Sequence, residues 1–136
     1  MFGYDISIIA RSPFGRSRDG RAITNILIAY NKSGKISYAP TATDDARGEW
    51  DGSTITINDD FRGKALPTII ELVHEGSHVL WRRDHPRKNI PKDKLETDNR
   101  LDEERAQKNQ MEMYLWLRTE FPKWPTDVEM EHRLNR

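Results

Sequence analysis

The feature that most constrains this chain is a pair of histidines four residues apart, in the segment His74-Glu75-Gly76-Ser77-His78. Just before it, Pro67 and the capping-box sequence Thr68-Ile69-Ile70-Glu71 are typical of the start of a helix, so we predict a helix over about 67–81. At 3.6 residues per turn, two side chains four positions apart lie on the same helix face. Any fold that contains this helix therefore places the two imidazoles side by side.

Two neutral imidazoles on one helix face can bind a single Zn²⁺ at about 2.0–2.1 Å. Glu75 follows His74 directly, so it flanks such an ion rather than ligating it, and it can accept a proton from water there. With four histidines and ten glutamates in 136 residues, the pattern arises by chance in about 0.8% of such sequences. The alternative is a surface helix with two unrelated histidines, but the position of the motif inside a well-marked helix favours a metal site.

The composition narrows the class of protein. A length of 136 residues suits one domain, residues 1–136. Cysteine is absent, which excludes disulfides, thiolate metal ligands and a cysteine nucleophile. Lysine and arginine number 22, as do aspartate and glutamate, so the formal net charge is zero. A nucleic-acid-binding protein would carry a basic excess, and we therefore expect no nucleic-acid partner.

The apolar runs of the chain are short. The longest, Ile26–Tyr30 and Val79–Trp81, fall far below the ~20 residues that span a bilayer, so we expect no membrane insertion. No basic segment followed by a long apolar stretch opens the chain, so we expect no signal peptide. These features predict a soluble protein and leave its cellular compartment open.

The first half of the chain has the composition of β-strands. Ile6–Ile9 is short and rich in β-branched residues, and the sequence Ser12-Pro13-Phe14-Gly15 then breaks it. Ile23–Tyr30 fits a helix or a strand by periodicity. A turn signal at 31–34 and alternation over 35–38 favour a hairpin made with that segment.

The clearest strand follows a loop. Residues 40–50, which include Asp44, read as that loop. In Ser53–Asn58 the apolar Ile55 and Ile57 alternate with polar residues, which is the period of a strand with one buried face.

The second half of the chain has the composition of helices. Beyond the helix at 67–81, the polar stretch over 82–99 contains two prolines and reads as a long loop, which in compact domains often serves function. Residues 101–117 have helical composition, and two prolines soon afterwards end that helix. Thr126–Glu129 has capping-box form and opens a final helix to about Leu134.

The histidine motif in its helix resembles the active-site helix of zincin metallopeptidases, in which both histidines bind zinc and the glutamate is the general base. The resemblance covers the strand at 53–58, the helix at 67–81 and the helix at 101–117. It implies an α+β, zincin-like fold in which a small twisted β-sheet packs on the active-site helix and a second long helix lies opposite. In such enzymes the strand before the helix binds substrate by strand addition, which implies that role for 53–58.

The small size and the His-Glu-Gly-Ser-His sequence also resemble compact bacterial metallopeptidase domains, including those that end toxins and secreted effectors. That resemblance implies a protein or peptide substrate. It also implies an immunity or inhibitor protein as a partner.

A catalytic zinc site needs a third protein ligand and an open position. Leu101–Ala106 is similar to the Glu-x-x-Ala element of gluzincin-type enzymes, which implies Glu103 as that ligand. Helical phase agrees, because Glu103 shares a face with the inward residues of its helix, namely Ala106, Gln110, Met113 and Leu117. Glu104, on a more mixed face, is an alternative. Asp84 is another, because its spacing matches metzincin-like enzymes, although those have glycine where this chain has Trp81.

Three further residues are weaker candidates. Glu71 lies one turn before His74, where it either orients an imidazole or only completes a capping box. Tyr114 and His85 could each donate to the oxyanion of a transition state, but both residue types more often belong to the core or the surface. Glu103 also has a structural explanation, since the macrodipole favours acidic residues in the first turn of a helix.

Taken together, the motif and its resemblance to zincins imply zinc-dependent hydrolysis of a peptide bond. His74, His78 and Glu103 would hold the Zn²⁺, and Glu75 would act as the general base. One alternative is a non-catalytic, zinc-stabilised protein-binding domain, which a closed site with four protein ligands, Asp84 among them, would favour. The other is a zinc hydrolase that acts on a bond other than the peptide bond.

Overall fold

The computed structural model describes residues 1–43 and 45–135, and Asp44, expected in a loop, lies outside them. The described chain is a mixed α+β structure that is mainly helical. Its helices are α1 (Gly3–Arg11), α2 (Pro13–Arg16), α3 (Arg18–Lys32), α4 (Ala65–Asp84), α5 (Leu95–Glu120) and α6 (Val128–Leu134). Its strands are β1 (Ile36–Ala39), β2 (Gly48–Trp50) and β3 (Ile55–Asn58), and the short 3-10 helices are η1 (Asp59–Phe61), η2 (Arg87–Asn89) and η3 (Lys92–Lys94).

The strand predicted at Ile6–Ile9 is wrong, because this segment belongs to helix α1. Its isoleucines are β-branched, but Phe2, Ile6 and Ile9 are spaced by four and three residues and all are buried. That spacing forms one helix face, and packing of the face overrides the intrinsic strand preference. Ser12 then starts α2 by accepting a hydrogen bond from the Gly15 N–H at 3.0 Å.

The hairpin predicted from Ile23–Tyr30 and 35–38 is also wrong. The first segment lies in helix α3, where Ser17 caps the N-terminus by accepting from the Gly20 N–H at 3.1 Å. The second segment overlaps β1, but β1 pairs in parallel with β3, with Ile36 opposite Ile55.

The sheet has the order β1-β3-β2, so β3 is the central strand. The strand predicted at 53–58 is confirmed over Ile55–Asn58, with Ile55 and Ile57 buried. β2 pairs antiparallel to β3 in a stretch expected to be loop. β2 has only three residues, with the polar Glu49 in the middle, and an alternation this short does not indicate a strand.

Helix α4 confirms the prediction at 67–81 and extends it at both ends. Its N-cap is Lys64, with no side-chain cap hydrogen bond, so the predicted capping box at 68–71 is wrong. Instead, the Thr68 hydroxyl lies 3.2 Å from the Phe61 carbonyl and 2.8 Å from the Tyr38 hydroxyl.

The long loop predicted at 82–99 is largely helical. The end of α4, both 3-10 helices η2 and η3 and the start of α5 account for most of it. α5 confirms the helix at 101–117, and α6 confirms the final helix. Asp127 rather than Thr126 caps α6, because its carboxylate accepts from the Met130 N–H at 3.1 Å.

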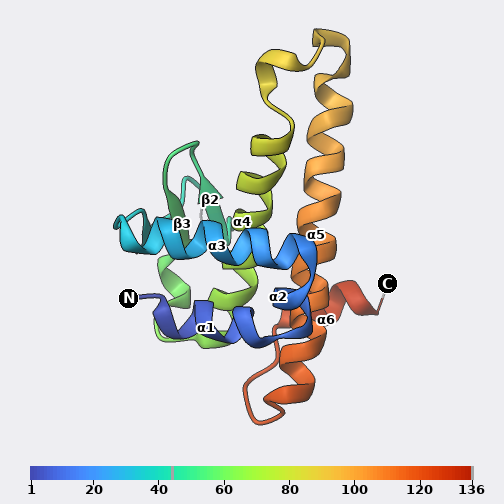
Figure 1. The fold of residues 1–136 in the computed structure, drawn as a ribbon. Coiled ribbons are helices and arrows are strands. Elements are labelled where there is room, and N and C mark those ends of the chain that lie inside the picture. The colour runs from blue at the N-terminus through green and yellow to red at the C-terminus, as the bar shows by residue number, and fades with distance from the viewer. Residues whose placement is uncertain (44, 136) are drawn as a thin grey trace.

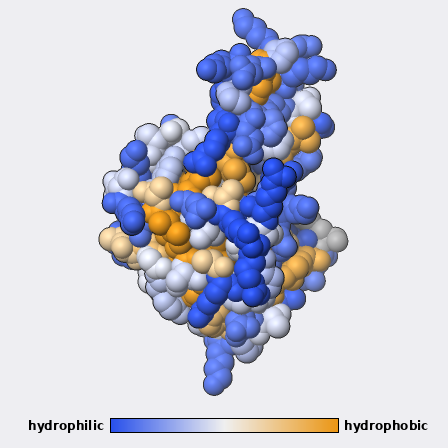
Figure 2. Space-filling model, in the orientation of Figure 1, coloured by the Kyte–Doolittle hydropathy of each residue, from blue (hydrophilic) through white to orange (hydrophobic). Residues whose placement is uncertain are grey.

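Helices α4 and α5 run side by side and project together beyond the rest of the molecule, while α3 crosses α4 and the small sheet lies next to α4 (Figure 1). Hydrophilic residues cover the projecting end, and apolar residues gather on the face over α1 and α3 (Figure 2). None of the described helices is both long and apolar enough to cross a membrane.

Gly76 explains how closely α3 approaches α4. A Cβ atom at this position would lie 2.9 Å from Ile23 Cγ2 and 3.5 Å from Leu27 Cδ2, both on α3. Contacts at 2.9 Å are shorter than carbon atoms tolerate, so the crossing requires glycine here. The motif helix is thereby held on its far side by the apolar face of α3.

Candidate metal centre

The two histidines of the motif point their Nε2 atoms at each other from one face of α4. The Nε2 atoms of His74 and His78 are 3.1 Å apart, and the rings meet nearly edge to face at 80°. Glu103 on α5 faces both of them, with Oε1 3.3 Å from His74 Nε2 and Oε2 3.3 Å from His78 Nε2. Helical phase predicts Glu103 on the inward face of its helix, and the packing of α5 against α4 brings its carboxylate to the histidines.

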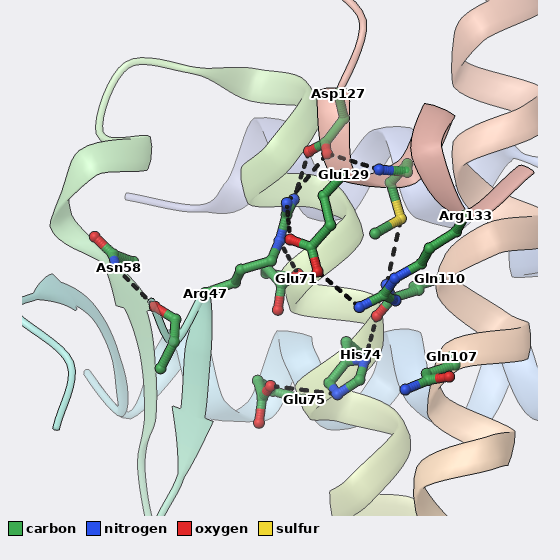
Figure 3. A network of polar contacts seen from close by, with 12 residues as sticks. Arg47, Asn58, Glu71, His74, Glu75, Gln107, Gln110, Asp127, Glu129 and Arg133 are labelled. Atoms are coloured by element: carbon green, nitrogen blue, oxygen red, sulfur yellow. Dashed lines mark hydrogen bonds and ion pairs between the residues drawn. The ribbon is translucent and has the colours of Figure 1, made fainter. Parts of the chain in front are cut away.

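A hydrogen bond to an acceptor fixes the orientation of each imidazole. His74 Nδ1 is hydrogen-bonded to Gln110 Oε1 (Figure 3). His78 Nδ1 lies 2.7 Å from Asp102 Oδ1. In neutral histidines, each Nδ1 then carries the proton and donates it, which leaves a lone pair on each Nε2. Two lone pairs and a carboxylate therefore converge on one point, an arrangement that suits a cation.

This donor set fits zinc. A tetrahedron with ligands about 2.0–2.1 Å from its centre has edges of about 3.3–3.4 Å. The Nε2–Nε2 separation of 3.1 Å is close to that edge. Each Nε2 lies 3.3 Å from a different oxygen of Glu103, and one donor atom from each of the three residues lies within 4.8 Å of the other two. Imidazole nitrogen with carboxylate oxygen is also a ligand set typical of catalytic zinc. Among the described residues, His74, His78 and Glu103 form the group of side chains that could hold a metal ion.

The electrostatics of the cluster show that its anionic groups stabilise positive charge. Burial lowers the pKa of His78, but hydrogen bonds to Asp102 and Glu103 outweigh it and raise that pKa to about 10. Burial also lowers the pKa of His74, but a hydrogen bond to Glu103 and the charges of Glu71 and Glu75 outweigh this effect and raise the pKa. Hydrogen bonds from the two histidines hold the pKa of Glu103 far below its usual range. In the metal-free state, protons therefore supply the positive charge that the cluster favours.

Glu75 lies beside this cluster without joining it. Its side chain is buried, and its Oε2 is 4.0 Å from His74 Nε2. Burial raises the pKa of Glu75 to about 7, although the two histidines oppose the shift. On its other side β2 passes closely, because a Cβ at Gly48 would lie 3.4 Å from Glu75 Cγ. A carboxylate with this pKa can take up and release a proton near neutral pH.

Glu71, one turn before His74, binds Arg47 instead of completing a capping box. Arg47 Nε donates to Glu71 Oε1 at 2.8 Å, and its Nη atoms donate to Asp127 and Glu129 near and in α6 (Figure 3). Burial raises the pKa of Glu71, and Arg47 and His74 oppose that shift. Glu71 contacts no imidazole by a hydrogen bond among the described residues, so its link to His74 is electrostatic.

The other candidates lie apart from the cluster. Asp84 and Glu104 are exposed and neither contacts the histidines in the described chain. Tyr114 is fully buried, and its hydroxyl donates to Glu131, which places it in the core. His85 stacks on Trp81 with ring centroids 3.9 Å apart, and its Nδ1 lies 3.0 Å from the Trp81 carbonyl. Neither Tyr114 nor His85 forms a hydrogen bond or ion pair with His74, His78 or Glu103 in the described chain.

The substrate-binding role expected for the strand at 53–58 is wrong. β3 pairs with β1 on one edge and β2 on the other, so its backbone groups are already used. The edge strand beside Glu75 is β2. The order of the strands in a sheet depends on pairing between distant segments, which the local pattern does not reveal.

Asp102, Gln110 and Arg47 are the contributors that the sequence did not indicate. Gln110 was expected on the inward face of its helix but had no assigned role. Asp102 is next to Glu103 in the sequence. No local pattern distinguishes a carboxylate that would bind a metal ion from one that orients a histidine. Arg47 comes from a stretch expected to be loop, and its partners are 24 and 80 residues away.

Comparisons with known proteins give no match: no protein-family model, no curated protein and no solved structure is significantly similar to this chain. Function is therefore inferred from the side chains of the site alone.

Proposed function

We propose that this protein is a zinc-dependent hydrolase that cleaves peptide bonds, with a zincin-like arrangement of α4, α5 and the sheet. The observation that carries the proposal is the convergence of His74 Nε2, His78 Nε2 and the Glu103 carboxylate, with both Nδ1 atoms bound to acceptors and Glu75 alongside. His74, His78 and Glu103 would hold Zn²⁺.

A zinc ion held there would polarise a carbonyl oxygen and lower the pKa of water toward about 7. The protein's own part in the reaction belongs mainly to Glu75. Its carboxylate accepts a proton from the attacking water and then donates it to the leaving amine. The burial that raises the pKa of Glu75 in the metal-free protein also keeps its carboxylate beside the histidines, with Oε2 4.0 Å from His74 Nε2.

The number of protein ligands favours catalysis over a purely structural zinc site. A structural zinc ion is held by four protein side chains, whereas a catalytic one has three and an open position. In the described chain the cluster has three members, and Asp84 does not join it. Glu103 is also about half exposed, at 48%, so the cluster is accessible from solvent.

The edge of β2 supports a peptide as the substrate. β2 uses one edge to pair with β3, and its other edge pairs with no strand among the described residues. An extended peptide could add to that edge by backbone hydrogen bonds. Because Gly48 of β2 packs against Glu75, a peptide bound there would lie next to the proposed general base.

The test is zinc content and hydrolysis by purified Glu75→Gln, with Glu104→Gln as the matched control on an exposed glutamate outside the cluster. We expect both variants to bind one zinc per chain. Hydrolysis of a casein or mixed-peptide substrate should fall by about 10²–10⁴-fold in Glu75→Gln alone, since glutamine cannot accept the proton. Equal activity of Glu75→Gln and the unmutated protein would overturn the role of Glu75, and an unmutated protein without zinc-dependent cleavage would overturn the proposed function.

A further inference from the structure

A pocket adjoins the metal-binding cluster on the side of His78. It has a volume of about 410 Å³ and is formed where the turn after β2 meets α4, η2 and α5. We call it the His78 pocket; the residues that matter in its lining are Trp50, Asp51, His78, Arg82, Arg87 and Asp102. Because His78 both lines this pocket and belongs to the candidate metal cluster, a substrate group in the pocket would lie next to the proposed zinc site.

The acidic groups of the His78 pocket are already occupied. Asp51 accepts hydrogen bonds from the backbone N–H groups and hydroxyls of Ser53 and Thr54. Asp102 Oδ1 binds His78, and its Oδ2 lies 3.6 Å from Arg82 Nη2. Both carboxylates are therefore engaged with donors of the protein itself.

One basic group of the same pocket has donors to spare. Arg87 is exposed and makes no side-chain hydrogen bond or ion pair with any described residue. Arg82 is held between two carboxylates, because its Nη1 binds Asp98 at 2.8 Å and its Nη2 lies 3.6 Å from Asp102 Oδ2. Its guanidinium therefore contributes positive charge to the wall of the pocket.

We propose that the His78 pocket binds a carboxylate of the substrate, held by the donors of Arg87, with the positive charge of Arg82 beside it. A guanidinium binds a carboxylate through charge-assisted hydrogen bonds, and the Trp50 ring can pack against the methylene groups that carry it. The proposal rests on the proposed function and specifies its substrate class. The carboxylate belongs to an aspartate or glutamate side chain or to the C-terminus of the peptide, and both sources present the same chemistry.

Binding to the metal-free protein tests the pocket without requiring activity. The probes are N-acetylglutamate amide, which has only a side-chain carboxylate, N-acetylglutamine, which has only a terminal carboxylate, and N-acetylglutamine amide, which has neither. The Trp50 indole N–H resonance, assigned with Trp50→Phe, reports binding. We expect one of the two acids to bind at least tenfold more tightly than the neutral amide, and the acid that binds identifies the source of the carboxylate. Equal binding of all three probes, or no binding of either acid, overturns the proposal.

Substitution of the free arginine assigns the effect to the pocket. Arg87→Gln should weaken binding of the preferred acid by about tenfold or more, because a hydrogen bond to a charged group contributes about 1.5–3 kcal/mol. Arg83→Gln is the matched control, since Arg83 is an exposed arginine at the end of α4 that does not line the pocket. If Arg87→Gln and Arg83→Gln lose the same affinity for the acid, the effect comes from general surface charge, and the assignment of the carboxylate to the His78 pocket is overturned.

Cleavage by the zinc-loaded protein separates failure of this inference from failure of the proposed function. The substrate is a mixture of peptides that differ at one residue and in having a free or amidated C-terminus. The unmutated protein should prefer peptides with the carboxylate chosen in the binding experiment, and Arg87→Glu should reverse that preference in favour of lysine or arginine. Cleavage with no such preference overturns the carboxylate pocket alone, whereas no cleavage of any peptide overturns the hydrolase function itself.

Discussion

At the scale of single residues, the site depends on which nitrogen of each imidazole carries the proton. Gln110 and Asp102 accept from the Nδ1 atoms of His74 and His78, so they set the tautomer that leaves both Nε2 lone pairs for a metal ion. The two acceptors differ in charge, because Gln110 is neutral and buried whereas Asp102 is anionic. An anionic acceptor makes its imidazole the better ligand, so His78 is expected to be the more strongly held of the two.

Removal of Asp102 should therefore weaken zinc binding without removing a ligand. We expect Asp102→Ala to bind zinc about 10–100-fold more weakly than the unmutated protein, measured by competition with a chromogenic chelator. Glu104→Ala, on an exposed face of the same helix, is the control and should bind zinc with unchanged affinity. Equal affinities of the two variants would show that Asp102 does not orient His78.

At the scale of secondary-structure elements, the way α4 ends favours Glu103 over Asp84 as the proposed third ligand. α4 continues without a break through Trp81 to Asp84. Six helical residues after His78 correspond to about 9 Å along the axis, so Asp84 is carried away from the metal-binding cluster. Glu103 instead arrives on the antiparallel α5, where the buried Ala106 allows the two helices to pack closely.

Zinc affinity of two variants checks this assignment. Glu103→Ala should lose most of its zinc in dialysis against a weak chelator, whereas Asp84→Ala should retain about one zinc per chain. Circular dichroism of both variants shows whether the helices remain. Loss of zinc from Asp84→Ala with retention by Glu103→Ala would mean that α4 unwinds after His78 to reach the metal.

The crossing of α3 over α4 makes a second prediction at this scale. Alanine gains up to about 1 kcal/mol over glycine in a helix, but a Cβ at Gly76 would lie 2.9 Å from the stiff β-branched side chain of Ile23, and such overpacking costs about 1–3 kcal/mol. We therefore expect Gly76→Ala to lower the free energy of unfolding in urea. Gly3→Ala in α1 is the control, because no atom lies within 4 Å of its added Cβ, and it should be neutral or stabilising.

The elements also show how far the sequence predicts this fold. The helices at 67–81, 101–117 and the C-terminus have caps, prolines or periodic apolar faces, and all three are confirmed. In the N-terminal part, Ile6–Ile9 predicts a strand and Ile23–Tyr30 fits a helix or a strand, yet both lie in helices. Clustered isoleucines favour strands locally, whereas their burial against other helices decides the outcome. In the candidate site, helical phase predicts that His74 and His78 share one face of their helix and that Glu103 lies on the inward face of the next. The residues that accept hydrogen bonds from the histidine Nδ1 atoms, and the position of β2 at the edge of the sheet, depend on packing between distant segments.

At the scale of the whole molecule, the candidate centre joins parts of the chain that are far apart in sequence. His74 and His78 come from α4 and Glu103 from α5, so a bound zinc ion would cross-link the two longest helices. Next to it, Arg47 links the start of β2 to α4 and to the N-terminus of α6. Formation of the site therefore requires most of the fold, and metal binding should in turn stabilise the fold.

Thermal unfolding with and without metal measures this coupling. A ligand that binds only the folded state at 100 times its dissociation constant stabilises that state by about 2.7 kcal/mol. For a domain of this size, zinc at that excess should raise the Tm by roughly 10 °C, and exhaustive chelation should abolish the increase. Glu75→Gln should keep the full increase because it retains all three ligands, whereas His74→Ala should lose it. An unchanged Tm of the unmutated protein across zinc addition and chelation would contradict a metal-binding role for the cluster, and would leave His74 and His78 as a protonated pair held by Glu103 and Asp102.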